Sequence, residues 1–149
     1  MRMLSISRRR SREAALQVLY ALDLAPRSEV RAGLEAVEVA FQRTCENFEL
    51  PEGARAFAKE LISGITQRRE ELDALLAAHS AHWRLSRMAT VDRNILRLGA
   101  YELVGSDAPT AVVIDEAVEL ARRFGGEASP GFVNGVLDAL ASVVRTKTP

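Results

Sequence analysis

Apolar side chains recur at helical spacing along most of this 149-residue chain. Positions three and four residues apart fall on one face of an α-helix, so this period predicts amphipathic helices. The first patterns cover residues 8–24, 29–47 and 53–78, and the last of these is one long run. In the first helix the repeating apolar positions are Ala15, Leu16, Leu19, Tyr20 and Leu22.

The second half continues the pattern in shorter segments. A short element is expected around residues 82–87, followed by helices over 91–105 and 110–124. The first of these helices has Thr90 as a candidate cap, and its run ILRLGAYEL is apolar almost all round, as in a central buried helix. The run AVVI at 111–114 would also suit a strand. The DEAVELARRF that follows keeps the helical period and ends at a Gly-Gly pair, which favours a helix.

The last helix has the clearest start signal. Ser129 is placed to cap it, and Pro130 suits its first position. Three glycines, Gly64, Gly99 and Gly135, lie inside predicted helices. Each costs about 1 kcal/mol there relative to alanine, so we expect close approach of a neighbouring helix at these positions.

Length and composition suit a folded domain with a core of its own. Hydrophobic residues make up 48% of the chain and charged residues 27%, which argues against extensive disorder. We predict a single compact all-α domain of six or seven helices over residues 8–145. A flexible N-terminal end at 1–7 and a C-terminal tail at 146–149 would flank it.

Charge and cysteine content exclude several classes of protein. The 20 basic and 20 acidic residues balance, so the chain is not a uniformly basic nucleic-acid binder. A single cysteine, Cys45, favours a reducing compartment. No apolar run reaches about 18 residues, so no transmembrane helix or membrane partner is expected. The pattern of a secretory signal is also absent.

Charge is nevertheless segregated at the N-terminus, where five arginines precede the first acidic residue: Arg2, Arg8, Arg9, Arg10 and Arg12. Cations at a helix N-terminus oppose the macrodipole by about 0.3–1 kcal/mol each, so stability does not explain them. A bound phosphate would reverse that sign, because helix N–H groups and guanidinium groups would both favour it. A solvated charge run is an equal alternative. A removable targeting segment fits less well, because the helical pattern follows directly.

Candidate catalytic and metal-binding residues form no diagnostic pattern. His79 and His82 are three residues apart, but zinc needs three or four ligands, and neither Cys45 nor Asp73 has a diagnostic spacing to them. Surface histidines and a small core cysteine are the simpler roles. The stretch FGGEASPG lacks the Lys-Ser/Thr of a phosphate loop. We predict no catalytic residue, no metal and no cofactor.

Single-stranded RNA is the nucleic acid that these residues would suit best. Reading a duplex groove needs a helix with polar base-reading side chains, and none is evident beyond the arginines. Single strands need cations with exposed aromatic rings on which bases stack. Tyr20 and Phe132 are the candidate rings, and core packing is the alternative for both.

Four segments match a known pattern in the same order along the chain. They are RRRSREAALQVLYALDL (8–24), VDRNILRLGAYEL (91–103), PTAVVIDEAVELARRFG (109–125) and FVNGVLD (132–138). Together they resemble the NusB family of bacterial transcription antitermination factors over nearly the whole chain. The resemblance implies a seven-helix all-α fold and a non-catalytic, cytoplasmic protein. It also implies binding of single-stranded boxA RNA of ribosomal RNA transcripts together with NusE, a small-subunit ribosomal protein, in a complex that suppresses termination by RNA polymerase.

The resemblance assigns roles by position. RNA contacts are implied for Arg8, Arg9, Arg10, Arg12, Tyr20 and Phe132. Contacts with NusE are implied for Asp92 and, on the same surface, Arg87. In the loop before FVNG, relatives often carry an acidic residue and a lysine where this chain has Ala128 and Gly131.

Two other functions stay open at this point. One is a helical protein-interaction module that binds no RNA. The other is the N-terminal domain type of a ribosomal RNA cytosine methyltransferase, although these 149 residues contain no Gly-rich strand–loop–helix for a methyl donor. The family contains monomers and homodimers, so homodimerisation is open as well.

Overall fold

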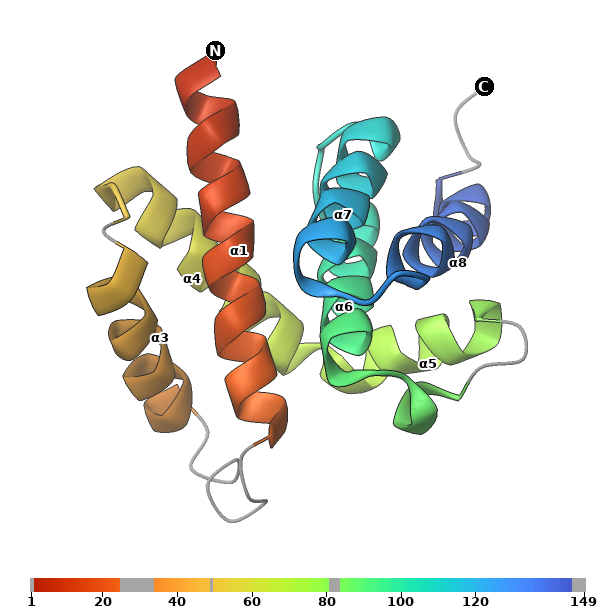
Figure 1. The fold of residues 1–149 in the computed structure, drawn as a ribbon, viewed down its shortest axis with the longest axis horizontal. Helices are drawn as coiled ribbons and strands as arrows, with labels where there is room; N and C mark the ends of the chain where they lie inside the picture. The colour runs from red at the N-terminus through yellow and green to blue at the C-terminus, as the bar shows by residue number, and fades with distance from the viewer. Residues whose placement is uncertain (1, 25–33, 49, 81–83, 146–149) are drawn as a thin grey trace. The chain divides into compact units, whose positions relative to one another are not determined.

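The computed structural model describes residues 2–24, 34–48, 50–80 and 84–145 (Figure 1). Within these ranges the chain forms seven α-helices, one short 3₁₀ helix and no strand, which confirms the all-α prediction. Contacts divide the chain into two compact units, Met1–Thr66 and Gln67–Pro149. The predicted tail at 146–149 lies outside the described residues.

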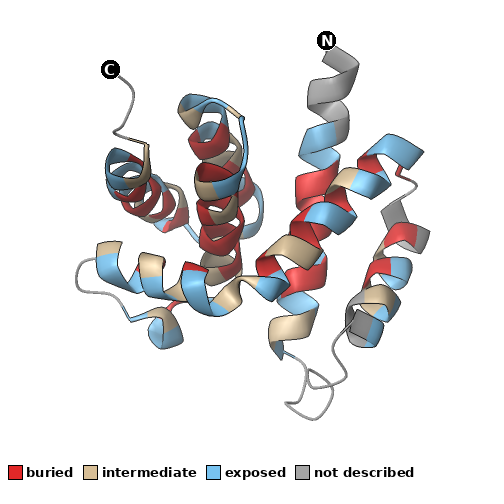
Figure 2. Ribbon diagram, turned by 180° about the vertical axis from the view of Figure 1, so that it is seen from behind, coloured by how far each residue is buried: buried red, intermediate tan, exposed pale blue. Residues whose placement is uncertain are grey.

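The first unit contains α1 (Arg2–Leu24), α3 (Leu34–Phe48) and α4 (Glu52–Gln67). α1 begins at Arg2, so the helix extends through residues that were expected to form a flexible end; Arg, Met and Leu there are good helix formers. α1 packs against α3. Its Ser11 hydroxyl also donates a 2.8 Å hydrogen bond to the carbonyl of Ala54 in α4. Residues 11–16 are all buried, so α1 is enclosed on every side there (Figure 2).

The second unit contains α5 (Arg69–His79), the 3₁₀ helix η1 (Leu85–Arg87), α6 (Thr90–Gly105), α7 (Thr110–Phe124) and α8 (Ser129–Val144). α6, α7 and α8 pack against one another, and α5 contacts α6 and α8 (Figure 1). Residues 94–100 are all buried, which confirms α6 as a central helix. α7 includes the AVVI run and ends before Gly125, so the helix was the correct alternative and the strand was not.

The long apolar pattern over residues 53–78 is two helices rather than one. α4 ends at Gln67, and Arg68 is a turn residue with φ −105° and ψ 16° before α5 begins. Apolar spacing continues across this turn, with Ile65 and Leu72 both buried, so the pattern alone does not reveal the break. The boundary between the two units falls at the same place.

Two predicted helix caps are wrong. Thr90 is already the first residue of α6, and the capping position belongs to Ala89, which makes no side-chain cap. Ser129 likewise lies inside α8, after Ala128. Its buried hydroxyl instead accepts a 2.9 Å hydrogen bond from the N–H of Gly126 and so stabilises the turn between α7 and α8. Both helices begin one residue earlier than cap chemistry suggested.

Arg145 ties the end of α8 to the corner between α6 and α7. Its Nε donates to the carbonyl of Leu103 at 2.9 Å, and its Nη2 donates to the carbonyls of Glu102 and Ser106 at 3.0 Å each. Nη1 reaches the carbonyl of Ala108 at 2.6 Å. The last carbonyls of a helix lack partners within it, so this guanidinium caps α6 from another helix.

Gly99 and Gly135 provide a matched test of helix packing. A Cβ at Gly99 would lie 2.6 Å from Cδ1 of Leu137, a fully buried side chain of α8, which confirms the expected close approach. A Cβ at Gly135 would meet nothing within 4 Å, so the same expectation is wrong there. We expect Gly99→Ala to lower the free energy of unfolding by about 1–2 kcal/mol through overpacking. Gly135→Ala should raise it by about 0.5–1 kcal/mol. Urea unfolding measures both, and shifts of the same sign would contradict this packing.

Candidate nucleic-acid interface

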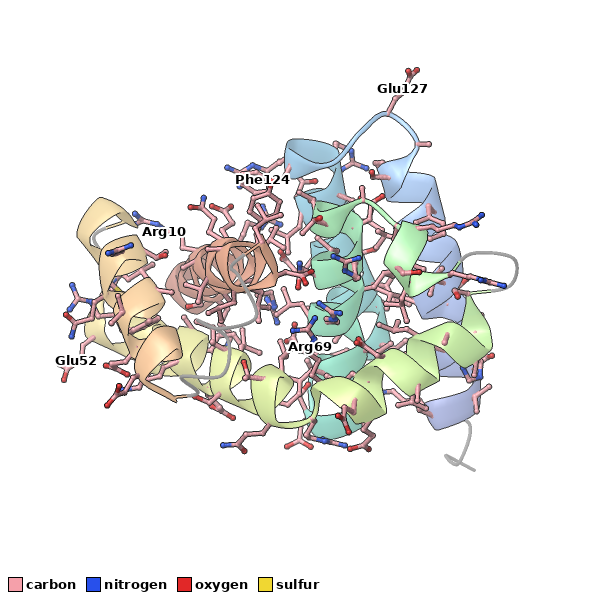
Figure 3. The ribbon with its side chains drawn as sticks, turned by 90° about the horizontal axis from the view of Figure 1, so that it is seen from below. Arg10, Glu52, Arg69, Phe124 and Glu127 are labelled. Atoms are coloured by element: carbon pink, nitrogen blue, oxygen red, sulfur yellow. The ribbon has the colours of Figure 1, made fainter. Side chains whose placement is uncertain are left out.

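The arginine cluster of α1 occupies two different environments. Arg8, Arg9 and Arg10 are exposed, and Figure 3 labels Arg10 on this helix. Arg12 is only 4% exposed, and its guanidinium lies near the ring of Phe57 in α4. Consecutive helical residues project about 100° apart, so the three exposed guanidinium groups point in different directions around α1. They can neutralise more than one phosphate of a strand that passes this helix.

Phe57 of α4 lies beneath two of these arginines. The Cζ atom of Arg8 is 4.8 Å from the centroid of its ring, and that of Arg12 is 5.6 Å away. Cations within about 6 Å of a ring face are attracted by its quadrupole, by about 0.5–1 kcal/mol at exposed sites and about 2 kcal/mol when desolvated. This attraction opposes the like-charge repulsion expected of an i, i+4 arginine pair. In the sequence, Phe57 is only one apolar position of a helical pattern, so nothing there links it to α1.

The two candidate stacking residues differ in exposure. Tyr20, in the last turns of α1, is 38% exposed, so part of its side chain is accessible. Phe132, in the first turn of α8, is half-buried. Tyr20 belongs to the first unit and Phe132 to the second.

The turn that precedes Phe132 is tightly built. A Cβ at Gly125 would lie 2.6 Å from Cβ of Ser129 and 2.8 Å from the carbonyl of Ala121, so a larger residue does not fit without a shift. The N–H of Ser129 donates back to the carbonyl of Gly126 at 3.1 Å. These contacts fix the start of α8, and hence the backbone of Phe132, relative to the end of α7.

Asp92 and Arg87 lie at the start of α6 and the end of η1. Arg87 is exposed, and Asp92 is in the first turn of α6. Nη1 of Arg93 donates to the carbonyl of Leu85 at 3.1 Å and so links the two elements. The Oδ1 atom of Asp92 is enclosed, yet it accepts no hydrogen bond from the described residues. An enclosed carboxylate oxygen gains free energy when a partner supplies a donor.

Cys45 has the environment of a core residue. It is buried in α3 and lines a cavity of about 260 Å³ together with Glu38, Phe41, Gln42 and Arg55. Burial raises the pKa of its thiol. The protonated form is therefore favoured, which suits packing and not nucleophilic attack.

The described residues offer no metal site. No group of three or more His, Cys, Asp or Glu side chains among them could hold an ion. Nδ1 of His79 lies 2.8 Å from the carbonyl of Leu75 in its own helix, and His82 lies outside the described residues. Within the same ranges, no helix has the length and apolar character needed to cross a membrane.

Comparison with known proteins identifies the family. The model of the NusB family matches residues 9–142. This chain belongs to the NusB family. It is 46% identical over 136 residues to transcription antitermination protein NusB of Myxococcus xanthus, covering 91% of this chain and 94% of the relative. The NusB protein of Sorangium cellulosum is 47% identical over 136 residues, with 91% of each chain covered. The resemblance drawn from the four sequence segments is thus confirmed.

Solved structures of the family share the fold. NusB of T. maritima superimposes with a TM-score of 0.80 at 35% identity, covering 91% of both chains. A crystal structure of antitermination factors NusB and NusE in complex with dsRNA contains a chain with a TM-score of 0.77 at 29% identity. That match covers 91% of this chain and 96% of the other. The helical fold is therefore that of the NusB family.

Proposed function

We propose that this protein is a transcription antitermination factor that binds single-stranded boxA RNA of ribosomal RNA transcripts together with NusE. The observation that carries the proposal is the family match over residues 9–142. A NusB relative has been solved with NusE and RNA in one complex. The protein would act as an adaptor in the antitermination complex of RNA polymerase, in the cytoplasm, with no catalytic step and no cofactor.

The arginines of α1 would contact the phosphates of the RNA, and two aromatic rings would contact its bases. Arg8, Arg9 and Arg10 supply exposed positive charge for phosphates, while Arg12 adds its charge from within the packing. Phosphate contacts fix position but carry no sequence information. Selectivity for boxA would therefore come from base contacts by Tyr20 and Phe132 and from the partner protein.

NusE would bind where η1 meets α6. Asp92 offers a carboxylate in the first turn of α6, and Arg87 offers an exposed guanidinium five residues upstream. A cationic or amide donor of NusE would pair with the Asp92 carboxylate. The assembly of RNA and NusE on one protein couples two moderate affinities.

The decisive experiment is a titration of labelled boxA RNA across a salt series, with and without NusE. We expect binding that weakens as salt rises, because phosphate contacts release counterions, and that tightens when NusE is present. A shuffled RNA of equal composition and a duplex form of boxA are the controls for sequence and strandedness. Binding to NusE without any binding to RNA would instead indicate a protein-interaction module.

Asp92→Arg tests the partner surface separately. We expect it to weaken binding to NusE by about 30-fold or more, since it places like charge where a donor should approach, and to leave binding to RNA alone unchanged. Asp107→Arg is the matched control, because Asp107 is an exposed acid between α6 and α7. Asp92→Asn removes the negative charge without adding a positive one, so it separates loss of the carboxylate from repulsion by the new arginine. Loss of RNA binding with intact NusE binding would reverse the assignment.

A further inference from the structure

We infer that Phe57 of α4 is a positioning residue of the RNA site, which holds the guanidinium of Arg8 in place for a phosphate. The inference rests on the proposed function, because it concerns how the arginines of α1 meet RNA. It extends the site from α1 to a helix to which the sequence assigns no RNA contact.

The geometry sets Arg8 and Arg12 apart from their neighbours. Both guanidinium groups approach the Phe57 ring, at 4.8 and 5.6 Å from its centroid, and Arg8 is the exposed member of the pair. Arg12 is buried, so it forms the inner contact and Arg8 the outer one. The ring is thus shared by a guanidinium that is available to solvent and one that is buried.

The position of the ring is itself well fixed. Phe57 lies between Ala54 and Ala58, which are both buried. Ala54 accepts the 2.8 Å hydrogen bond from Ser11, which joins α4 to the stretch of α1 between Arg8 and Arg12. Movement of α4 relative to this part of α1 would break that buried bond. The ring and the two arginines therefore form one local assembly.

A guanidinium on an aromatic face keeps its edge available. Its five N–H donors lie in the plane of the group, so contact through the face leaves donors free to point sideways at a phosphate. An unsupported arginine must lose rotamer freedom when it binds. Contact with Phe57 already restricts the Arg8 side chain in the free protein, so less rotamer freedom is lost when RNA binds. Arg8 should therefore contribute more affinity than an arginine of equal exposure without a ring beneath it.

The test is a double-mutant cycle between Phe57 and Arg8, read out as affinity for boxA RNA in the presence of NusE. Phe57→Leu keeps an apolar side chain but removes the ring, and we expect it to weaken binding by about 3- to 10-fold, the range for ordering one long side chain. In the Arg8→Ala background the same substitution should have no further effect on affinity. Phe57→Tyr keeps the ring and should bind like the parent.

Two controls separate positioning from general loosening of the first unit. Phe41→Leu removes another ring of this unit, in α3, and should change the melting temperature without changing RNA affinity. Phe57→Leu should lower the melting temperature in both the parent and the Arg8→Ala backgrounds. If loss of stability alone weakened binding, RNA affinity would fall in both backgrounds as well. Equal losses of RNA affinity in both backgrounds, or no loss in either, would overturn the positioning role. Failure of the parent protein to bind boxA RNA at all would instead overturn the proposed function.

Discussion

Asp73→Ala is expected to lower the free energy of unfolding by about 3 kcal/mol, the effect of removing one partner of a buried ion pair. Asp73 of α5 accepts two hydrogen bonds from Arg97 of α6, from Nε at 2.8 Å and from Nη2 at 3.0 Å. The Arg97 side chain is 5% exposed and that of Asp73 29%. Nη1 of Arg97 also donates to Asn94 at 3.1 Å. Truncation of Asp73 leaves an enclosed guanidinium without its carboxylate.

A double-mutant cycle measured by urea unfolding tests this pair. Arg97→Met should cost less than Asp73→Ala, because Asp73 is more exposed and Arg69 lies 3.9 Å from it. The double variant should be more stable than Asp73→Ala, since an apolar replacement of both partners leaves no buried charge. Glu71→Ala is the control on the same helix: Glu71 is exposed and pairs with Arg68 at 2.8 Å, so its loss should be barely measurable. If Asp73→Ala behaves like Glu71→Ala, the pair does not stabilise the contact between α5 and α6.

Periodicity predicted where the helices form, but it missed one break between helices and misplaced two N-terminal caps. α7 and α8 were predicted nearly residue by residue, because their apolar positions repeat without interruption and Gly125 closes the first of them. The turn at Arg68 was missed because neither proline nor glycine marks it and the apolar spacing runs through it. The caps at Thr90 and Ser129 were misplaced because a residue type that favours the capping position does not show at which residue the backbone becomes helical. Each of these residues is the first residue of its helix.

For the candidate site, the sequence indicated which charged and aromatic residues to consider, but not which of them are buried or which residues they contact. Charge segregation pointed to the arginines of α1, yet it treated Arg12 like its neighbours, although Arg12 is buried and the others are exposed. Burial of residues 11–16 depends on packing with segments far from α1 in sequence, such as Ala54 of α4, which a pattern within α1 does not encode. Contacts such as Phe57 with Arg8, or Asp73 with Arg97, join helices that are far apart in sequence, so they required the structure.

Replacement of Arg8, Arg9 and Arg10 by alanine is expected to weaken binding to boxA RNA by about 100-fold at 0.1 M salt. Each phosphate contact to a single strand contributes about 0.7 to the slope of log affinity against log salt. Loss of three contacts should therefore reduce the slope by about 2. Between 1 M salt, where the contribution of the contacts vanishes, and 0.1 M salt, this change in slope corresponds to a loss of affinity of about 100-fold. These side chains are exposed, so their removal should leave the unfolding transition nearly unchanged.

A second triple variant shows whether position matters or only net charge. Arg43, Arg84 and Arg122 are also exposed, and their replacement by alanine changes the net charge by the same amount. If the arginines of α1 contact phosphates directly, this control should keep the parent slope and lose little affinity, because it leaves those contacts in place and the slope depends on the number of phosphate contacts. Equal losses in both triple variants would mean that the chain attracts RNA through its overall charge, and the N-terminal cluster would then have no specific role.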